Sequence, residues 1–75
     1  MGRIPRPTGK EMVRFLERYG LRVIRIVGSH HFMDGGGKRT TVPVHSNQNL
    51  KIGTLRSIQR DIELSPADFE RRWNE

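Results

Sequence analysis

The sequence predicts an α+β fold, in which a three-stranded antiparallel sheet carries helices on one face and a short extra helix ends the chain. Two observations predict it. Apolar residues at helical spacing occur near both ends of the chain, whereas residues 21–45 are rich in β-branched residues and broken by glycine turns. Elements in this order pack as a sheet with helices on one side. The length suits one domain, placed at residues 1–75.

The first helix is predicted to begin after Thr8 and to end at Gly20. Thr8 and Glu11 have the spacing of a capping box. The apolar stripe of this helix consists of Met12, Phe15, Leu16 and Tyr19. Gly20 supplies a left-handed stop, and Leu21 is placed to pack back on the helix. Residues 1–7 hold two prolines and no periodic pattern, so we expect a flexible lead there.

Three short strands are predicted next, at residues 21–27, 30–33 and 40–45. Gly28 and Ser29 break the first strand from the second. The glycine-rich run at residues 34–37 has the composition of a hairpin turn. Pro43 lacks a backbone N–H, which indicates an edge position or a bulge in the third strand.

Two helices complete the predicted order after a polar connection at residues 46–49. The second helix runs over residues 51–62 and buries Leu55, Ile58 and Ile62. Ser65 and Asp68 have capping-box spacing, with proline at the first helical position. The short last helix that they open offers Phe69 and Trp73 to the core.

Basic residues are concentrated in the first part of the chain. Residues 1–60 hold 12 Lys and Arg against 3 Asp and Glu, a net charge of +9, whereas residues 61–75 hold 2 against 5, a net charge of −3. A body this basic attracts polyanions, and nucleic acid is the commonest one. An anionic membrane surface is the rival partner, but no segment pairs a basic face with a broad apolar face.

The composition also excludes some classes of site. The chain has no cysteine, so it forms no disulfide and no thiolate zinc site, which fits a cytoplasmic location. No apolar run approaches the ~20 residues that span a bilayer. The first residues lack the apolar stretch of a secretion signal.

The three histidines, His30, His31 and His45, are the side chains best suited to proton transfer near neutral pH. RNA carries its own nucleophile, the 2′-hydroxyl beside each phosphate. Its cleavage therefore requires a base for that proton, an acid for the leaving oxygen, and cations for the phosphate. A basic protein with a well-placed histidine can supply these groups without a metal or a cofactor.

The segment from Gly28 to His31 is the sharpest local cluster. Gly28 allows backbone to approach a phosphate, and Ser29 adds a hydrogen-bond donor. Adjacent residues of a strand point to opposite faces, so at most one of His30 and His31 faces a shared site. The alternative is that both are ordinary exposed hairpin residues. A zinc site is disfavoured because the two rings diverge and no cysteine or nearby carboxylate completes a tetrahedral set.

Two groups of cations are candidate phosphate contacts. Lys10, Arg14 and Arg18 lie four residues apart on one helix face, which is either a phosphate track or, more commonly, a solvated surface. Lys51 and Arg56 belong to a helix start that also carries hydroxyl groups, and a helix N-terminus is a sound phosphate site. The glycines at 35–37 lack the lysine and hydroxyl residue that follow a nucleotide-binding loop, so they indicate only a turn.

Taken in order, these segments resemble the HicA family, the toxin half of HicA–HicB toxin–antitoxin modules in bacteria and archaea. The resemblance runs from about Thr8 to Phe69. It rests on Gly9-Lys10-Glu11, Tyr19-Gly20-Leu21, Arg25, Gly28-Ser29-His30-His31-Phe32, Val42-Pro43-Val44-His45, Leu50-Lys51 and Gly53-Thr54-Leu55-Arg56-Ser57-Ile58. Two positions depart from the family pattern: Ile52 stands where proline is common, and Glu63 where glycine often makes a turn. Both concern the bounds of the second helix.

The resemblance implies a fold like a double-stranded-RNA-binding domain, α-β-β-β-α. It also implies translation-independent cleavage of mRNA, growth arrest, and neutralisation by a HicB-like antitoxin. The family's catalytic histidine directly follows Gly-Ser, which corresponds to His30, whereas His31 falls at a position without that role.

The sequence therefore predicts a metal-independent endoribonuclease with His30 as general base or acid and His45 as a possible second proton carrier. The predicted RNA contacts are Ser29, Arg25, Lys10, Lys51 and Arg56. Two rival functions remain. The first is a non-catalytic RNA-binding module of the same fold, and the second is an interaction protein whose basic surface only docks an acidic partner.

Overall fold

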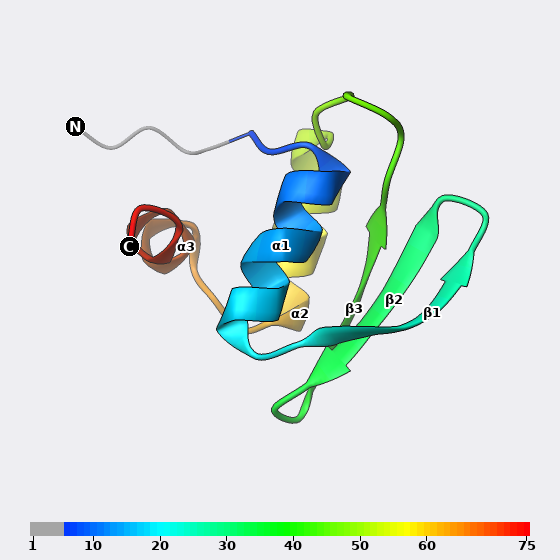
Figure 1. The fold of residues 1–75 in the computed structure, drawn as a ribbon. Coiled ribbons are helices and arrows are strands. Elements are labelled where there is room, and N and C mark those ends of the chain that lie inside the picture. The colour runs from blue at the N-terminus through cyan, green and yellow to red at the C-terminus, as the bar shows by residue number, and fades with distance from the viewer. Residues whose placement is uncertain (1–5) are drawn as a thin grey trace.

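The computed structural model describes residues 6–75, and its elements follow the predicted order (Figure 1). They are α1 (Gly9–Tyr19), β1 (Arg22–Val27), β2 (His30–Gly35), β3 (Lys38–Pro43), α2 (Ile52–Asp61) and α3 (Pro66–Trp73). The strands form one antiparallel sheet in the order β1-β2-β3. Figure 1 shows the helices on one side of this sheet, so the predicted α+β class is confirmed.

The local signals for α1 are confirmed at both ends. The Thr8 hydroxyl accepts from the N–H of Glu11 at 3.2 Å, and the Glu11 carboxylate accepts from the N–H of Thr8 at 2.9 Å. Gly20 adopts a left-handed conformation with a φ of 116°, which favours glycine because it has no Cβ. The N–H of Leu21 then donates to the carbonyl of Leu16 at 2.9 Å, so the chain turns sharply into β1.

The chain before α1 is fixed from Pro7 onward. Pro7 is buried, and its carbonyl accepts from the N–H of Leu50 at 2.8 Å. Asn49 bridges to Thr8 in the same place. The flexible lead expected at residues 1–7 therefore does not extend to Pro7, and residues 1–5 lie outside the described part of the chain.

The hairpin between β2 and β3 is tighter than the predicted turn. The two strands pair as far as Gly35 with Lys38, which leaves only Gly36 and Gly37 in the turn. Both have positive φ, 59° and 78°, as a two-residue hairpin turn that matches strand twist requires. Pro43 is the last residue of β3, which is an edge strand, so the predicted edge position is confirmed.

A β-bulge in β1 was not predicted. The register shifts between Val23, which pairs with Met33, and Arg25, which pairs with Phe32. Regular alternation would place Val23 and Arg25 on the same face of the sheet. The extra residue, Ile24, instead lets Val23 pack against the core while Arg25 lies over the ring of Phe32 on the opposite face.

The core lies between the sheet and the helices. Its buried hydrophobic residues are Met12, Phe15, Leu16, Leu21, Met33, Val42, Leu50, Leu55, Ile58, Ile62 and Phe69. The third helix adds an aromatic cluster, because the Phe15 ring lies 4.9 Å from the Phe69 ring and 5.2 Å from the Trp73 ring, centroid to centroid. Within residues 6–75, no helix is both long enough and apolar enough to cross a membrane.

The ends of α2 and α3 differ in detail from the prediction. Helix α2 is one residue shorter at each end than residues 51–62 and is followed by Glu63 in a left-handed conformation with a φ of 61°. The Ser65 hydroxyl accepts from the N–H of Asp68 at 3.1 Å. The Asp68 carboxylate pairs with Arg71 at 2.6 Å, so the structure records only one half of the second predicted capping box.

Candidate functional site

The two adjacent histidines of β2 lie on opposite faces of the sheet. Met33 is fully buried, so its side chain lies on the face of the sheet that the helices cover. Strand alternation places His31, two residues before it, on the same helix-covered face. His30 shares the opposite, helix-free face with Phe32. His30 is exposed and His31 is half-buried, so the predicted divergence of the two rings is confirmed. A site built on His30 therefore lies on the open face and at the end of the sheet.

The turn before His30 is held against the segment that follows β3. The carbonyl of Ser29 accepts from the N–H of Val44 at 2.8 Å, and Nδ1 of His31 lies 3.3 Å from the same carbonyl. Gly28 has a φ of 59°, a conformation that favours glycine. These contacts bring Ser29 and His30 to the end of the sheet from which His45 also emerges.

His45 and Lys51 line one hollow at this end of the molecule. Its volume is about 190 Å³, and its lining residues are Pro43, His45, Gln48, Asn49, Leu50, Lys51 and Thr54. Pro43 is the cross-strand partner of His30, so the hollow adjoins the start of β2. The hollow therefore brings together His45 and Lys51, whereas His30 does not line it and adjoins it only through its strand partner Pro43.

The start of α2 borders the same hollow, because Lys51 and Thr54 both line it. Lys51 is the N-cap residue and makes no side-chain cap hydrogen bond, and the first turn contains no acidic residue. The uncapped N–H groups and the helix dipole together favour an anion. Figure 1 shows that α1 also begins at this end of the molecule, and Gly9 lies against Pro43 and Val44 at the end of β3. Two helix N-termini, each next to a lysine, therefore lie at the end of the molecule that carries the histidines.

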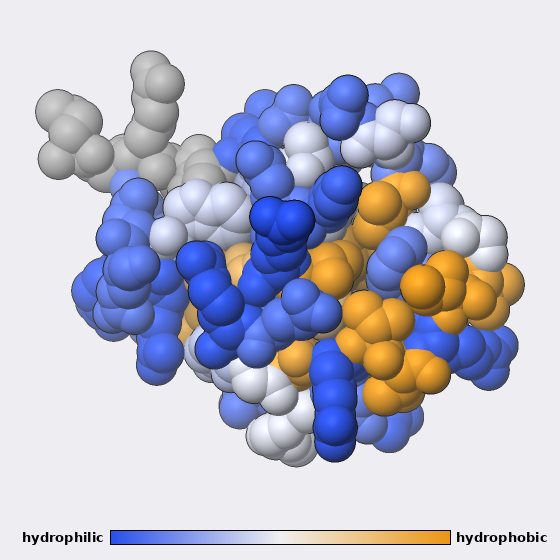
Figure 2. Space-filling model, viewed as in Figure 1, coloured by the Kyte–Doolittle hydropathy of each residue, from blue (hydrophilic) through white to orange (hydrophobic). Residues whose placement is uncertain are grey.

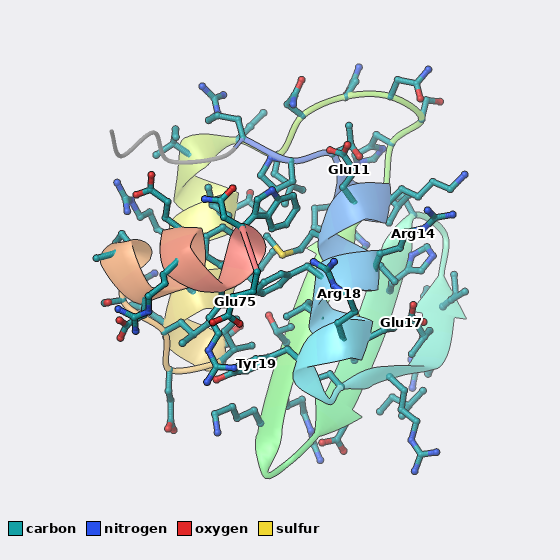
Figure 3. All side chains as sticks on the ribbon, turned by 60° about the vertical axis from the view of Figure 1, so that its left-hand side comes forward. Glu11, Arg14, Glu17, Arg18, Tyr19 and Glu75 are labelled. Atoms are coloured by element: carbon teal, nitrogen blue, oxygen red, sulfur yellow. The ribbon has the colours of Figure 1, made fainter. Side chains whose placement is uncertain are left out.

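The cationic row predicted on α1 divides between two places. Lys10 and Arg14 line a hollow of about 290 Å³ together with Thr8, Glu11, Ser46 and Asn47. Arg18 lies instead over the Phe15 ring, 5.8 Å from its centroid, and Figure 3 shows its side chain directed toward α3. Only Lys10 and Arg14 are therefore near the segment that follows His45, and a track along all three residues is not formed.

The two remaining predicted contacts lie apart from the hollow at His45. Arg25 is exposed on the open face, and its guanidinium carbon lies 5.4 Å from the ring centroid of Phe32. Phe32 in turn lies two residues from His30 along β2. Arg56 is half-buried on α2 and lines neither of the two hollows, as far as the described residues show. Arg25 thus shares a face with His30, whereas the structure gives Arg56 no position beside it.

A polar groove along the free edge of β3 was missed by the sequence reasoning. It has a volume of about 420 Å³ and is lined by Arg39, Thr40, Thr41, Gly53, Thr54, Ser57, Ile58 and Asp61. Thr54 also lines the His45 hollow, so the two depressions are contiguous. The hydroxyl residues of α2 were visible in the sequence, but nothing local indicated that they face the edge of β3.

Metal ligands do not gather at this site. Among residues 6–75, no three His, Asp or Glu side chains are grouped so that they could hold a metal ion. The site instead offers imidazole, ammonium, hydroxyl and backbone N–H groups. This set can bind a phosphate and exchange protons with it.

The fold and this site define a class of protein: a small, basic α+β domain with proton-transfer groups and phosphate-binding groups at one end of its sheet. A family model described as "HicA toxin of bacterial toxin-antitoxin" matches residues 9–64, about three quarters of the chain. The chain belongs to this HicA toxin family. Its role is that of a toxin in a toxin–antitoxin module, and its partner is an antitoxin. No curated protein matches the sequence.

Proposed function

We propose that this toxin is an endoribonuclease that cleaves mRNA by proton transfer, without a metal ion, and that His30 is its catalytic residue. The observation that carries the proposal is the position of His30, exposed at the end of the sheet beside Ser29 and the hollow that holds His45 and Lys51. An activity on mRNA also fits a cytoplasmic location.

The proposed reaction needs two proton transfers. A base removes the proton from the 2′-hydroxyl, and the resulting oxygen attacks the adjacent phosphorus. The bond from phosphorus to the 5′-oxygen breaks, and an acid protonates that oxygen. The products carry a 2′,3′-cyclic phosphate and a free 5′-hydroxyl. His30 performs one of the two transfers, and His45 is the proposed carrier for the other.

The surrounding donors hold the phosphate in this proposal. Lys51 and the uncapped start of α2 neutralise its charge from the side of His45. Ser29 and Arg25 lie on the side of His30, and Lys10 extends the positive potential toward the loop after His45. Arg56 stays a predicted RNA contact that is remote from the cleaved bond.

Substitution of the histidines tests the proposal. His30→Ala should lower the cleavage rate by about 10²–10⁴-fold, the usual contribution of general acid–base catalysis. Because His30 is exposed, the fold and the affinity for RNA should be retained. His31→Ala is the matched control, since its ring lies on the opposite face and should matter much less.

The outcomes separate the proposal from its rivals. Cleavage that persists in His30→Ala but disappears in His31→Ala would move the catalytic role to the helix-facing ring. Binding of RNA without any cleavage by the wild-type chain would favour a non-catalytic RNA-binding module. Loss of cleavage on addition of EDTA would contradict the metal-independent reaction, and products without a cyclic or 3′ phosphate would contradict attack by the 2′-hydroxyl.

A further inference from the structure

The open face of the sheet, which carries His30, presents its side chains in three cross-strand rows. The rows are Val27, His30 and Pro43; then Arg25, Phe32 and Thr41; then Arg22, Asp34 and Arg39. Neighbouring rows lie two strand residues apart, about 6.4–6.8 Å. Figure 1 shows the helices on the other side of the sheet. An aromatic ring therefore stands at the centre of the row next to the proposed catalytic histidine.

Phe32 is the aromatic side chain that the core does not use. The other four aromatic residues pack together between α1 and α3; they are Phe15, Tyr19, Phe69 and Trp73. Phe32 is half-buried and belongs neither to the core cluster nor to the residues packed against it. A single ring at the surface is ordinary by itself. Its place one row from His30 is what gives it a role.

The neighbours of Phe32 suit a nucleobase. Proteins hold single-stranded nucleic acid with aromatic rings on its bases and cations on its phosphates. The guanidinium carbon of Arg25 lies 5.4 Å from the Phe32 ring centroid, and a planar guanidinium stacks on a base as well as on a ring. Arg25 is exposed, so its side chain has room to move aside and admit a base between the guanidinium and the ring.

A broad apolar protein contact fits this face less well. Figure 2 shows hydrophobic residues gathered over β1, but these side chains do not share one face. Val27 pairs with His30 on the open face, whereas Ile26 pairs with His31 on the opposite face. The three rows hold three arginines and one carboxylate, that of Asp34. This balance favours a polyanion over an apolar partner.

Stacking on Phe32 requires a base that is not paired in a duplex. In an RNA helix each base is covered on both faces by its neighbours, and the grooves offer only base edges, phosphates and 2′-hydroxyls. An unpaired base can turn out of the strand and present its face to the ring of Phe32. The open face therefore suits a single-stranded segment.

We propose that Phe32 is a substrate-positioning residue, on which an unpaired base of the RNA stacks next to the phosphate presented to His30. The toxin then acts on single-stranded segments of RNA, although its fold is like that of a double-stranded-RNA-binding domain. This inference rests on the proposed function, because it takes His30 as the centre of the reaction. It adds the class of substrate and the residue that selects it.

Binding of the intact chain to two labelled oligonucleotides, followed by fluorescence anisotropy, tests the proposal without cleavage. Both have 2′-O-methyl riboses, which offer no 2′-hydroxyl for attack, but one carries bases and the other is abasic. The wild-type chain should bind the base-bearing strand more tightly. Phe32→Leu should lower that affinity by at least about fivefold, the low end of what one stacked base contributes, and should leave the affinity for the abasic strand unchanged. Phe32→Tyr keeps the ring and should bind both strands as the wild-type chain does.

Tyr19 provides the matched control, because it is a second half-buried ring with an arginine over it. The guanidinium carbon of Arg72 lies 5.3 Å from the Tyr19 ring centroid. Tyr19 is the last residue of α1, whereas the histidines lie at the end where α1 begins. Tyr19→Leu should therefore leave both affinities unchanged. Equal losses in Tyr19→Leu and Phe32→Leu would overturn a specific role for Phe32.

A duplex of the base-bearing sequence gives a second comparison. Its bases are already stacked on one another, so Phe32→Leu should not change the affinity of the chain for it. An equal loss of affinity for the single strand and for the duplex would overturn the assignment to unpaired RNA.

The outcomes distinguish failure of this inference from failure of the proposed function. Equal losses for the base-bearing and abasic strands in Phe32→Leu would overturn the inference, since the ring would then support the fold or the phosphate contacts. In cleavage assays, Phe32→Leu should lower kcat/KM and keep the wild-type pH profile, and a changed profile would overturn a positioning role. If the wild-type chain cleaves no RNA, the proposed function fails, and the comparison of the two strands still decides whether a base stacks on Phe32.

Discussion

Replacement of Gln59 by leucine should stabilise the protein, because this side chain is buried and its amide finds no hydrogen-bond partner in the described part of the chain. Gln59 lies on the core-facing side of α2 and is only 2% exposed. Neither its amide nitrogen nor its amide oxygen has a hydrogen-bond partner within residues 6–75. A buried polar group left unsatisfied costs about 1–3 kcal/mol relative to its solvated state. Leucine has a similar size and an equally good helix propensity, so it removes that cost with little repacking.

The expected gain for Gln59→Leu is about 1–2 kcal/mol in the free energy of unfolding, after allowance for imperfect packing. For a domain of this size, 1 kcal/mol corresponds to roughly 4–8 °C in Tm. Urea unfolding followed by circular dichroism should therefore show a higher midpoint with an unchanged m value. Gln48→Leu is the control: Gln48 is exposed on the loop before α2, and its substitution should change stability by less than about 0.5 kcal/mol.

A fall in stability on Gln59→Leu would refute this reasoning. It would show that the amide of Gln59 is hydrogen-bonded in solution to an ordered water molecule. Equal effects of Gln59→Leu and Gln48→Leu would show that the change acts through general hydrophobicity rather than through the unsatisfied amide.

Three further predictions follow from individual backbone positions and from the charge. Glu63→Gly should raise the free energy of unfolding by about 0.5–1 kcal/mol in chemical denaturation, because Glu63 holds a φ of 61° that costs an L-residue more than glycine; an unchanged midpoint would contradict strain there. Gly9→Ala should lower the free energy of unfolding by about 1–3 kcal/mol. A Cβ at Gly9 would overlap the carbonyl oxygen of Pro43 and approach within 2.9 Å of the Cα of Val44. An unchanged free energy of unfolding would show that α1 can move away from β3. The affinity for RNA should fall steeply between low and physiological salt, because each phosphate neutralised by this basic chain releases counterions, and a flat titration by filter binding would contradict an electrostatic interface.

The elements that could be predicted from the sequence are those whose signals are local. The Thr8 and Glu11 capping box, the stop at Gly20 and the glycine turn at residues 36–37 each depend on a few neighbouring residues, and each is present in the structure. Strand bounds were less well predicted, because the pairing of β2 with β3 continues through Asp34 and Gly35, whose composition favours a turn.

The parts of the site that were not predicted depend on tertiary contacts. Alternation could show that His30 and His31 diverge, but only the burial of Met33 shows which of them faces the helices. The groove beside β3 depends on how α2 packs against that strand, and the sequence holds no local signal for it. Likewise, the row of Lys10, Arg14 and Arg18 divides because Arg18 turns toward the aromatic cluster, an effect of the packing of α3.

The bulge in β1 determines which of its side chains share a face of the sheet with His30. Because Ile24 is the additional residue, the strand changes register between its halves: Val23 faces the core, yet Arg25 lies on the open face with His30. The same insertion leaves Ile24 exposed and interrupts the free edge of the sheet. One local irregularity thus contributes the cation Arg25 to the face on which His30 is proposed to act, and it leaves the neighbouring side chain of Ile24 exposed.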